Sequence, residues 1–213
     1  MIEKLLEIIS PDACFVCQAE GSCLCQNCAE TALVSKKPSC ILCNKLNNDG
    51  RTCSSCYAKS RLRGASVSYR YEGVAKDLIW AMKYQNKRSI ARYLATKLMP
   101  EDGVVCFVPS DGKARRRRGY DQAEILAKTY AKINNLSFNN LLLRSKHTKQ
   151  VGKNRQQRID NIKDNFVAIV DITGLNIILV DDVITTGATV AECSRVLKLA
   201  GAKSVRAVAV AKG

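Results

Sequence analysis

Apolar residues from about residue 65 onward gather in short runs that predict buried strands separated by helices. The strand candidates are an alternating segment with Val67, Tyr69 and Tyr71 on one face, the apolar runs Val104–Val108, Ile177–Val180 and Val205–Val210, and a short stretch at Leu141–Leu143. Apolar residues recur at helical spacing over residues 74–84, 89–99, 121–133 and 188–200. Because strands alternate with helices, the pattern predicts an α/β domain with a mostly parallel sheet and flanking helices.

The N-terminal part of the chain follows a different pattern. Residues 2–9 have the apolar spacing of a short amphipathic helix, and a cysteine-rich segment with few apolar runs follows them. We therefore expect a domain boundary near residue 60. This divides the chain into a cysteine-rich module over residues 1–60 and the α/β domain over residues 61–213.

The length and composition of the chain suit a folded protein inside the cell. A chain of 213 residues with 46% hydrophobic residues can bury a proper core. Its apolar stretches are interrupted well before the roughly 20 residues that span a bilayer. Glu3 and Glu7 also interrupt the place where a signal peptide needs a continuous apolar segment. The sequence therefore predicts a cytoplasmic protein that does not insert into membranes.

Positive charge is concentrated in the second of the two predicted domains. The formal net charge of the chain is +15. Residues 1–60 hold six Lys/Arg and six Asp/Glu, whereas residues 61–213 hold 28 and 13. We expect a polyanion to be attracted to the α/β domain rather than to the cysteine-rich module.

Eight of the 11 cysteines form four Cys-x-x-Cys pairs in the N-terminal module. The predicted metal ligands are Cys14, Cys17, Cys25, Cys28, Cys40, Cys43, Cys53 and Cys56. Each pair can chelate one ion, and two pairs complete the tetrahedron that structural Zn²⁺ prefers, so two zinc sites are predicted. Adjacent pairs would form each site, although cross-brace pairing, disulfides or redox pairs are alternatives, and Cys23 could compete as a ligand. Cys106 and Cys193 are expected to be buried structural thiols.

Two acids and a threonine-rich turn directly follow one of the predicted strands. Asp181 and Asp182 come after the apolar run, and the segment 185–189 then leads into a helix. The carboxyl ends of parallel strands are where open α/β sheets bind ligands. Backbone N–H groups of the turn and of the helix start can hold a phosphate, while the acids suit neutral donors such as ribose hydroxyls.

This fourteen-residue segment, IILVDDVITTGATV, closely resembles the 5-phosphoribosyl-1-pyrophosphate (PRPP) motif of type I phosphoribosyltransferases. The resemblance implies that Asp181 and Asp182 contact ribose hydroxyls. It also implies that Mg²⁺ accompanies the pyrophosphate group of PRPP. The residues implied for the 5-phosphate are Thr185, Thr186, Gly187, Ala188 and Thr189.

A run of arginines precedes one of the predicted helices, and its charge suits pyrophosphate or a nucleic-acid backbone. We expect residues 110–119 to form a basic loop. The polar, cationic segment 145–165 lacks periodicity and is expected to be a second, mobile loop. The candidate ligands for pyrophosphate or the DNA backbone are Lys83, Arg115, Arg116, Arg117, Arg118, Arg155 and Arg158.

Taken together, these features resemble the ComF family of competence proteins over nearly the whole chain. The shared features are the paired cysteines, the Tyr71-Glu-Gly73 turn, Lys83 after a helix, Arg118-Gly-Tyr-Asp-Gln122, the segment 150–166 and the PRPP motif. The resemblance implies a type I phosphoribosyltransferase-like domain preceded by a double zinc ribbon. It further implies binding of single-stranded DNA without sequence preference during natural transformation, with other competence or DNA-processing proteins as candidate partners.

Binding of PRPP and catalysis are separate hypotheses, and the sequence leaves both open. One alternative is an active phosphoribosyltransferase that acts on an unidentified base or amine. Another is a PRPP-sensing regulator without catalysis. No catalytic residue stands out, because the lone histidine, His147, lies in a polar segment and is expected to be exposed.

Overall fold

A computed structural model describes residues 13–85, 87–145 and 165–213 of the protein. Its helices are α2 (Gln26–Ala32), α3 (Ser54–Ser60), α4 (Gly73–Tyr84), α5 (Arg88–Ala95), α6 (Gly112–Arg118), α7 (Gln122–Ile133) and α9 (Ala188–Leu199). Its strands are β1 (Gly64–Arg70), β2 (Val104–Phe107), β3 (Leu142–Arg144), β4 (Phe166–Ala168), β5 (Asn176–Ile184) and β6 (Ser204–Lys212). The predicted helix over residues 2–9 and most of the predicted loop over 145–165 lie outside the described residues.

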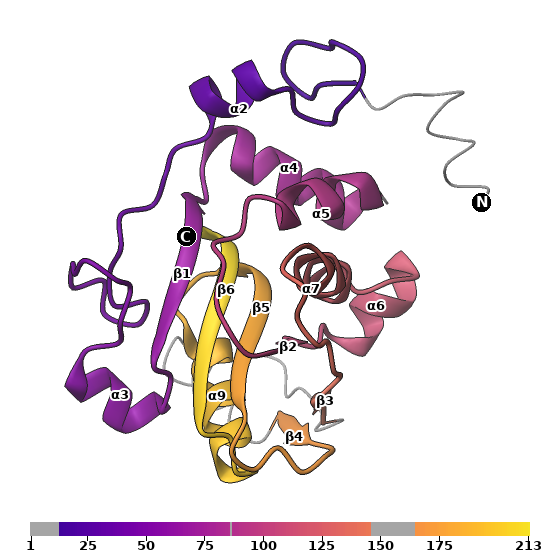
Figure 1. Ribbon diagram of the computed structural model, residues 1–213. Coiled ribbons are helices and arrows are strands. Elements are labelled where there is room, and N and C mark those ends of the chain that lie inside the picture. The colour runs from indigo at the N-terminus through magenta and orange to yellow at the C-terminus, as the bar shows by residue number, and fades with distance from the viewer. Residues whose placement is uncertain (1–12, 86, 146–164) are drawn as a thin grey trace, which may run out of the picture.

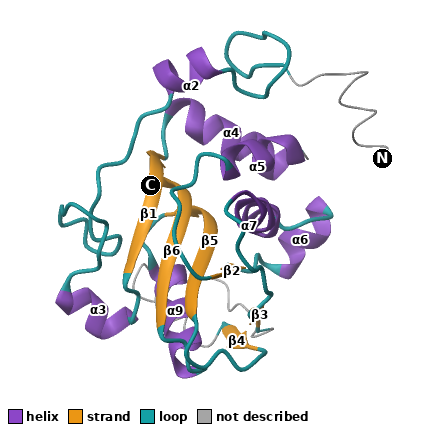
Figure 2. Cartoon of the chain, viewed as in Figure 1, coloured by secondary structure: helices purple, strands orange, loops and turns teal. Residues whose placement is uncertain are grey.

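A four-stranded parallel sheet forms the centre of the fold, in the order β1-β6-β5-β2 (Figures 1 and 2). A separate pair of short antiparallel strands, β3 and β4, lies beside it. Helices α4, α5 and α7 cover one face of the main sheet, and α9 covers the other. The predicted mostly parallel α/β architecture is confirmed.

The central strand β5 is buried on both faces, which explains its continuous apolar sequence. Ile178 and Val180 pack into the core under α4, α5 and α7. Ile177 and Leu179 point the other way and pack with α9. The carboxyl end of this strand is thereby fixed between two layers of helices.

The structure corrects the expectation that residues 110–119 form a loop, because most of them form helix α6. Asp111 caps the helix, its side chain accepting a hydrogen bond from the backbone N–H of Lys113 at 2.9 Å. The Lys, Ala and Arg residues that follow are strong helix formers, and Gly119 ends the helix with a φ of 75°. The loop was predicted from the high charge of the segment, although its residues also have high helix propensity.

Two other boundaries differ from the expectation. Strand β5 continues through Asp181 and Asp182 to Ile184, because its end pairs with the long strand β6. Helix α5 ends at Ala95 rather than near residue 99, and the Thr96 hydroxyl donates to the Tyr93 carbonyl at 2.7 Å. The acids therefore lie within the strand and not in a loop after it.

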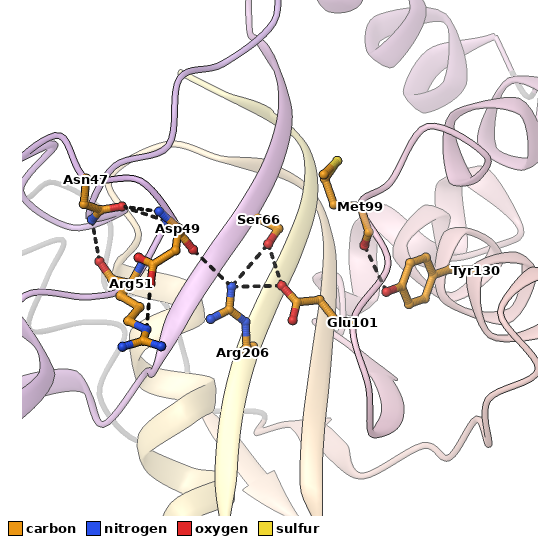
Figure 3. Close-up of polar contacts among 9 residues, drawn as sticks. Asn47, Asp49, Arg51, Ser66, Met99, Glu101, Tyr130 and Arg206 are labelled. Atoms are coloured by element: carbon orange, nitrogen blue, oxygen red, sulfur yellow. Dashed lines mark hydrogen bonds and ion pairs between the residues drawn. The ribbon is translucent and has the colours of Figure 1, made fainter.

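The cysteine-rich module packs against the α/β domain through apolar and polar contacts. Leu24 and Leu33 belong to the same buried cluster as residues of α4 and α5. On the other side, the Arg206 guanidinium of β6 lies 2.9 Å from the Glu101 carboxylate and donates to the Asp49 carbonyl at 3.4 Å (Figure 3). A domain boundary near residue 60 stays a prediction. Across the described residues, no helix has the length and apolarity needed to cross a bilayer.

Candidate functional site

The candidate site is built at the carboxyl end of β5, on the loop that leads into α9. Asp182 is buried, with 8% of its surface exposed, and Asp181 is partly buried. Because consecutive strand residues point to opposite faces, the two carboxylates have different surroundings. Asp182 lies on the face covered by α4, and Asp181 turns toward α9.

Lys83, the penultimate residue of α4, pairs with Asp182. Its Nζ lies 2.7 Å from Asp182 Oδ1, and the two side chains are 24% and 11% exposed. Burial of the ammonium acts to lower the pKa of Lys83, but the neighbouring Asp182 carboxylate outweighs it and the pKa is raised. This pair brings one predicted pyrophosphate ligand to one predicted ribose ligand across 99 residues of sequence.

The surroundings of Asp181 strongly perturb its pKa. Burial, together with the negative charge of Asp182, raises the pKa of Asp181 well above its usual value. Its Oδ1 accepts a hydrogen bond from the backbone N–H of Asp182 at 2.9 Å. The carboxylate is therefore held in place at the strand end.

The threonine turn exposes its hydroxyls while its glycine is buried. Thr185 and Thr186 are exposed, and the Thr186 hydroxyl accepts from the Ala188 N–H at 3.3 Å. Gly187 caps α9 with a φ of 79°, a left-handed conformation that favours glycine. The N–H groups that begin α9 point toward this turn, an arrangement that attracts a phosphate.

Lys212, at the end of β6, also holds the turn and was missed by the sequence analysis. Its ammonium donates to the Thr185 carbonyl and, at 2.6 Å, to the Gly213 carbonyl. Burial lowers the pKa of Lys212. Because Ile184 and Lys212 are register partners on neighbouring parallel strands, the predicted sheet could have revealed this neighbour.

The arginine segment lies on α6, close to the end of α4. Arg115, Arg116 and Arg117 are exposed, whereas Arg118 is partly buried. Among the described residues, the buried Nε of Arg118 has no hydrogen-bond partner. The predicted ligands Arg155 and Arg158, like His147, lie outside the described residues.

Residues after the arginine segment tie α6 and α7 to the site. Asp121 caps α7 and accepts hydrogen bonds from the Ser110 N–H at 2.8 Å and the Ser110 hydroxyl at 2.9 Å. Burial raises the pKa of Asp121 despite these donors. The Tyr120 hydroxyl donates to the Met82 carbonyl, next to Lys83. These contacts fix the arginine helix beside the carboxyl edge of the sheet.

The eight predicted metal ligands form two four-cysteine clusters from adjacent pairs. The clusters are Cys14, Cys17, Cys25 and Cys28, and Cys40, Cys43, Cys53 and Cys56, with sulfurs within 4.8 Å of one another. The Cys17 and Cys25 sulfurs are 3.7 Å apart, as are those of Cys43 and Cys53. A tetrahedral ion with bonds of about 2.3 Å to sulfur needs sulfurs about 3.8 Å apart, so both clusters could hold zinc.

The other three cysteines are buried outside these clusters. Cys23 belongs to the same buried cluster as residues of α4 and α5. Cys106 and Cys193 are fully buried on the opposite face of the sheet, as predicted, and burial raises the pKa of both thiols. They belong to the apolar packing of the domain.

The second cysteine cluster lies against the threonine turn. A Cβ atom at Gly187 would come within 2.5 Å of Leu42 Cδ2 and 3.3 Å of the Ile41 carbonyl oxygen. Ile41 and Leu42 lie between the cluster ligands Cys40 and Cys43. The turn between Cys40 and Cys43 therefore lies against Gly187 of the candidate site, a contact that the sequence could not reveal.

Comparison with known proteins assigns the matched region to a phosphoribosyl transferase domain, whose model matches residues 117–213. The chain is 32% identical over 154 residues to Competence protein F of Haemophilus influenzae, covering 63% of this chain and 66% of that protein. It is 26% identical over 196 residues to Competence protein ComFC of Streptococcus pneumoniae, covering 88% and 86%. It is also 26% identical over 219 residues to DNA utilization protein YhgH of Salmonella typhi, covering 92% and 95%.

Among solved structures, the allosteric regulatory enzyme of purine biosynthesis aligns with a TM-score of 0.40 and 20% identity, covering 58% of this chain and 25% of that chain. The domain match includes the acids, the threonine turn and α9. With its parallel sheet and flanking helices, the domain has the type I phosphoribosyltransferase-like fold that the sequence predicted.

Proposed function

Because this chain belongs to the ComF family, we propose that it binds PRPP with Mg²⁺ and handles single-stranded DNA during natural transformation. We place this role in the cytoplasm, where thiols stay reduced and the two cysteine clusters would hold structural Zn²⁺. PRPP is the small ligand, and DNA is the polymeric ligand, bound without sequence preference. Other competence or DNA-processing proteins are further candidate partners.

The observation that carries the PRPP proposal is the arrangement at the end of β5. An acid pair, an exposed threonine turn and the N-terminus of α9 lie within nine residues of sequence on one sheet edge. In our proposal the backbone N–H groups of residues 185–189 hold the 5-phosphate, and Asp181 and Asp182 accept from the ribose hydroxyls. The acids would repel a phosphate, so charge assigns the 5-phosphate to the backbone N–H groups and the ribose hydroxyls to the acids.

The cations beside this edge suit the pyrophosphate end of PRPP. Lys83 is already held at Asp182, where its ammonium could contact both the acid and a pyrophosphate oxygen. Arg118 offers a partly buried guanidinium nearby, and Arg155 and Arg158 remain further candidates. Mg²⁺, when bound, would neutralise charge on the pyrophosphate oxygens.

Calorimetry with PRPP and Mg²⁺ tests this site. We expect the double substitution Asp181→Asn and Asp182→Asn to weaken binding by tenfold or more, because two carboxyl acceptors for the ribose hydroxyls are lost. Asp102→Asn is the matched control, since Asp102 is exposed before β2, at the opposite end of the sheet. No binding by the wild type, or equal binding by the double variant, would contradict the proposal.

The DNA proposal is supported by the charge distribution and by the names of the relatives. Residues 61–213 carry the whole net charge of +15, and relatives are named as competence and DNA utilization proteins. Contacts to phosphates release counterions, so affinity for an oligonucleotide should fall steeply as salt rises. A flat response in a salt titration would argue against backbone contacts.

Phosphoribosyl transfer is the second candidate function, favoured by the phosphoribosyl transferase model that spans the acids and the turn. Release of pyrophosphate from PRPP across a panel of bases and amines tests it. Release with one acceptor would identify the activity. PRPP binding without release for any acceptor would instead support a PRPP-sensing role.

A further inference from the structure

An aromatic pair is exposed on the outer face of α4, the helix that carries Lys83. Trp80 is 50% exposed and Tyr84 is 57% exposed. Their ring centroids lie 5.6 Å apart at an interplanar angle of 44°. The opposite face of the helix is apolar and buried, with Leu78, Ile79 and Met82 in the core. The helix therefore packs on the core through its opposite face and does not need Trp80 or Tyr84 for this packing.

One cation lies over a ring of this pair, and two more follow the end of α4. The Arg117 guanidinium of α6 lies over the Tyr84 ring, 5.6 Å from its centroid. Lys87 and Arg88, just beyond the end of α4, are exposed, and Arg88 lies 4.9 Å from the centroid of Tyr120. Guanidinium groups that lie over rings are held in place by cation–π attraction and can still reach a phosphate.

The other exposed charges on α4 do not offset the positive charge of Lys87, Arg88 and Arg117. Lys76 and Asp77 lie on the same exposed face and their charges cancel. The surface thus combines two half-exposed aromatic rings with net positive charge. An acidic or purely apolar protein partner would match only one of these properties, whereas single-stranded nucleic acid offers stacking bases and anionic phosphates together.

We propose that Trp80, Tyr84 and Arg117 form a platform on which bases of single-stranded DNA stack while neighbouring cations hold the phosphates. This inference rests on the proposed DNA-binding function and gives it a location. Every base has an aromatic face, so such a platform binds without sequence preference. It lies on the outer face of α4, whereas Asp182 of the acid pair contacts Lys83 on the same helix.

The chain contains a single tryptophan, which makes the platform directly observable. Tryptophan fluorescence of the zinc-loaded full chain reports on Trp80 alone, and the anisotropy of a labelled oligothymidine reports total binding. We expect the oligonucleotide to quench the fluorescence with the same midpoint as the anisotropy change. A matched abasic oligonucleotide, which keeps the phosphates, should quench much less.

Substitutions separate stacking from charge. Trp80→Ala should weaken oligothymidine binding by about 5- to 100-fold, the range expected for loss of one stacked base. Trp80→Phe should recover part of this loss. Tyr57→Ala and Lys59→Ala are controls, because both residues are exposed on α3 in the cysteine-rich module and should leave the affinity unchanged. Arg117→Ala should weaken binding, unlike Lys59→Ala.

The outcomes distinguish failure of the platform from failure of the DNA proposal. Anisotropy binding without quenching, and with Trp80→Ala equal to wild type, would overturn the platform and leave DNA binding intact. Equal quenching by the abasic oligonucleotide would also overturn stacking. No anisotropy change with the wild type would overturn both proposals. Sedimentation that shows a dimer lost in Trp80→Ala would assign the aromatic pair to an interface instead.

Discussion

Replacing Lys83 by methionine tests the contact that joins α4 to the end of β5. The substitution keeps the length of the side chain and removes its charge, which leaves the largely buried Asp182 without a partner. At 2.7 Å, an effective dielectric constant of about 20 gives an attraction of about 6 kcal/mol. Desolvation of both charges offsets much of this. We therefore expect a net coupling of about 2–3 kcal/mol.

The coupling is measured by a double-mutant cycle of urea unfolding with zinc-saturated protein. The cycle uses Lys83→Met, Asp182→Asn and the two together. Lys83→Met alone should lower the free energy of unfolding by about 2–4 kcal/mol, because an unpaired charge stays buried. Adding Asp182→Asn should restore part of this stability, since the unpaired charge is then gone.

A second ion pair of equal length gives the matched control. Lys128 and Glu124 of α7 are also 2.7 Å apart, but their side chains are 57% and 34% exposed. The same double-mutant cycle on that pair should give a coupling free energy of less than about 0.5 kcal/mol. If the Lys83 and Asp182 cycle gave a value as small as this, the reasoning that burial makes the contact strong would be refuted.

Three further predictions concern the threonine turn and its neighbours. Gly187→Ala should destabilise the protein by about 1–3 kcal/mol in thermal unfolding, because Gly187 has a left-handed φ and Leu42 lies close to it. Adding Leu42→Ala should recover part of the lost stability. No recovery would exclude a clash between the new Cβ and Leu42. Cys43→Ser should weaken PRPP binding in calorimetry more than Cys17→Ser does, because Ile41 and Leu42, between two ligands of the second cluster, lie against Gly187. Equal effects of the two substitutions would contradict this. Because the pKa of Asp181 is raised, its carboxylate takes up a proton at a higher pH than an ordinary Asp does. The PRPP affinity of the wild type should therefore start to fall at a higher pH than that of Asp181→Asn. Identical pH profiles would exclude Asp181 as a ligand of PRPP.

Local features of the sequence were enough to predict how the candidate site is arranged at the sheet edge. The acid pair, the threonine turn and the following helix are contiguous, so their order in the chain specifies most of their arrangement. The two cysteine clusters were predictable for the same reason, because each uses adjacent pairs with short spacers. Whether Asp181 and Asp182 bind ribose hydroxyls stays a prediction.

Contacts between distant segments could not be predicted from these patterns. Lys83 and Asp182 meet only when α4 packs on β5, and Leu42 reaches Gly187 only when the cysteine-rich module docks on the sheet. The error over residues 112–118 had another cause, since the arginines were judged by charge although their helix propensity is high. Trp80 was overlooked although its spacing from Tyr84 places both on one helix face.

Phosphorus NMR of Mg²⁺-PRPP tests the central claim most directly, because it resolves the 5-phosphate from the pyrophosphate. We predict that the wild-type protein shifts the 5-phosphate resonance. Ala188→Asp should largely abolish that shift, since an acid suits the first turn of α9 but repels a phosphate held there. A 5-phosphate resonance that does not move with the wild type, or that moves equally with Ala188→Asp, would contradict the proposed site.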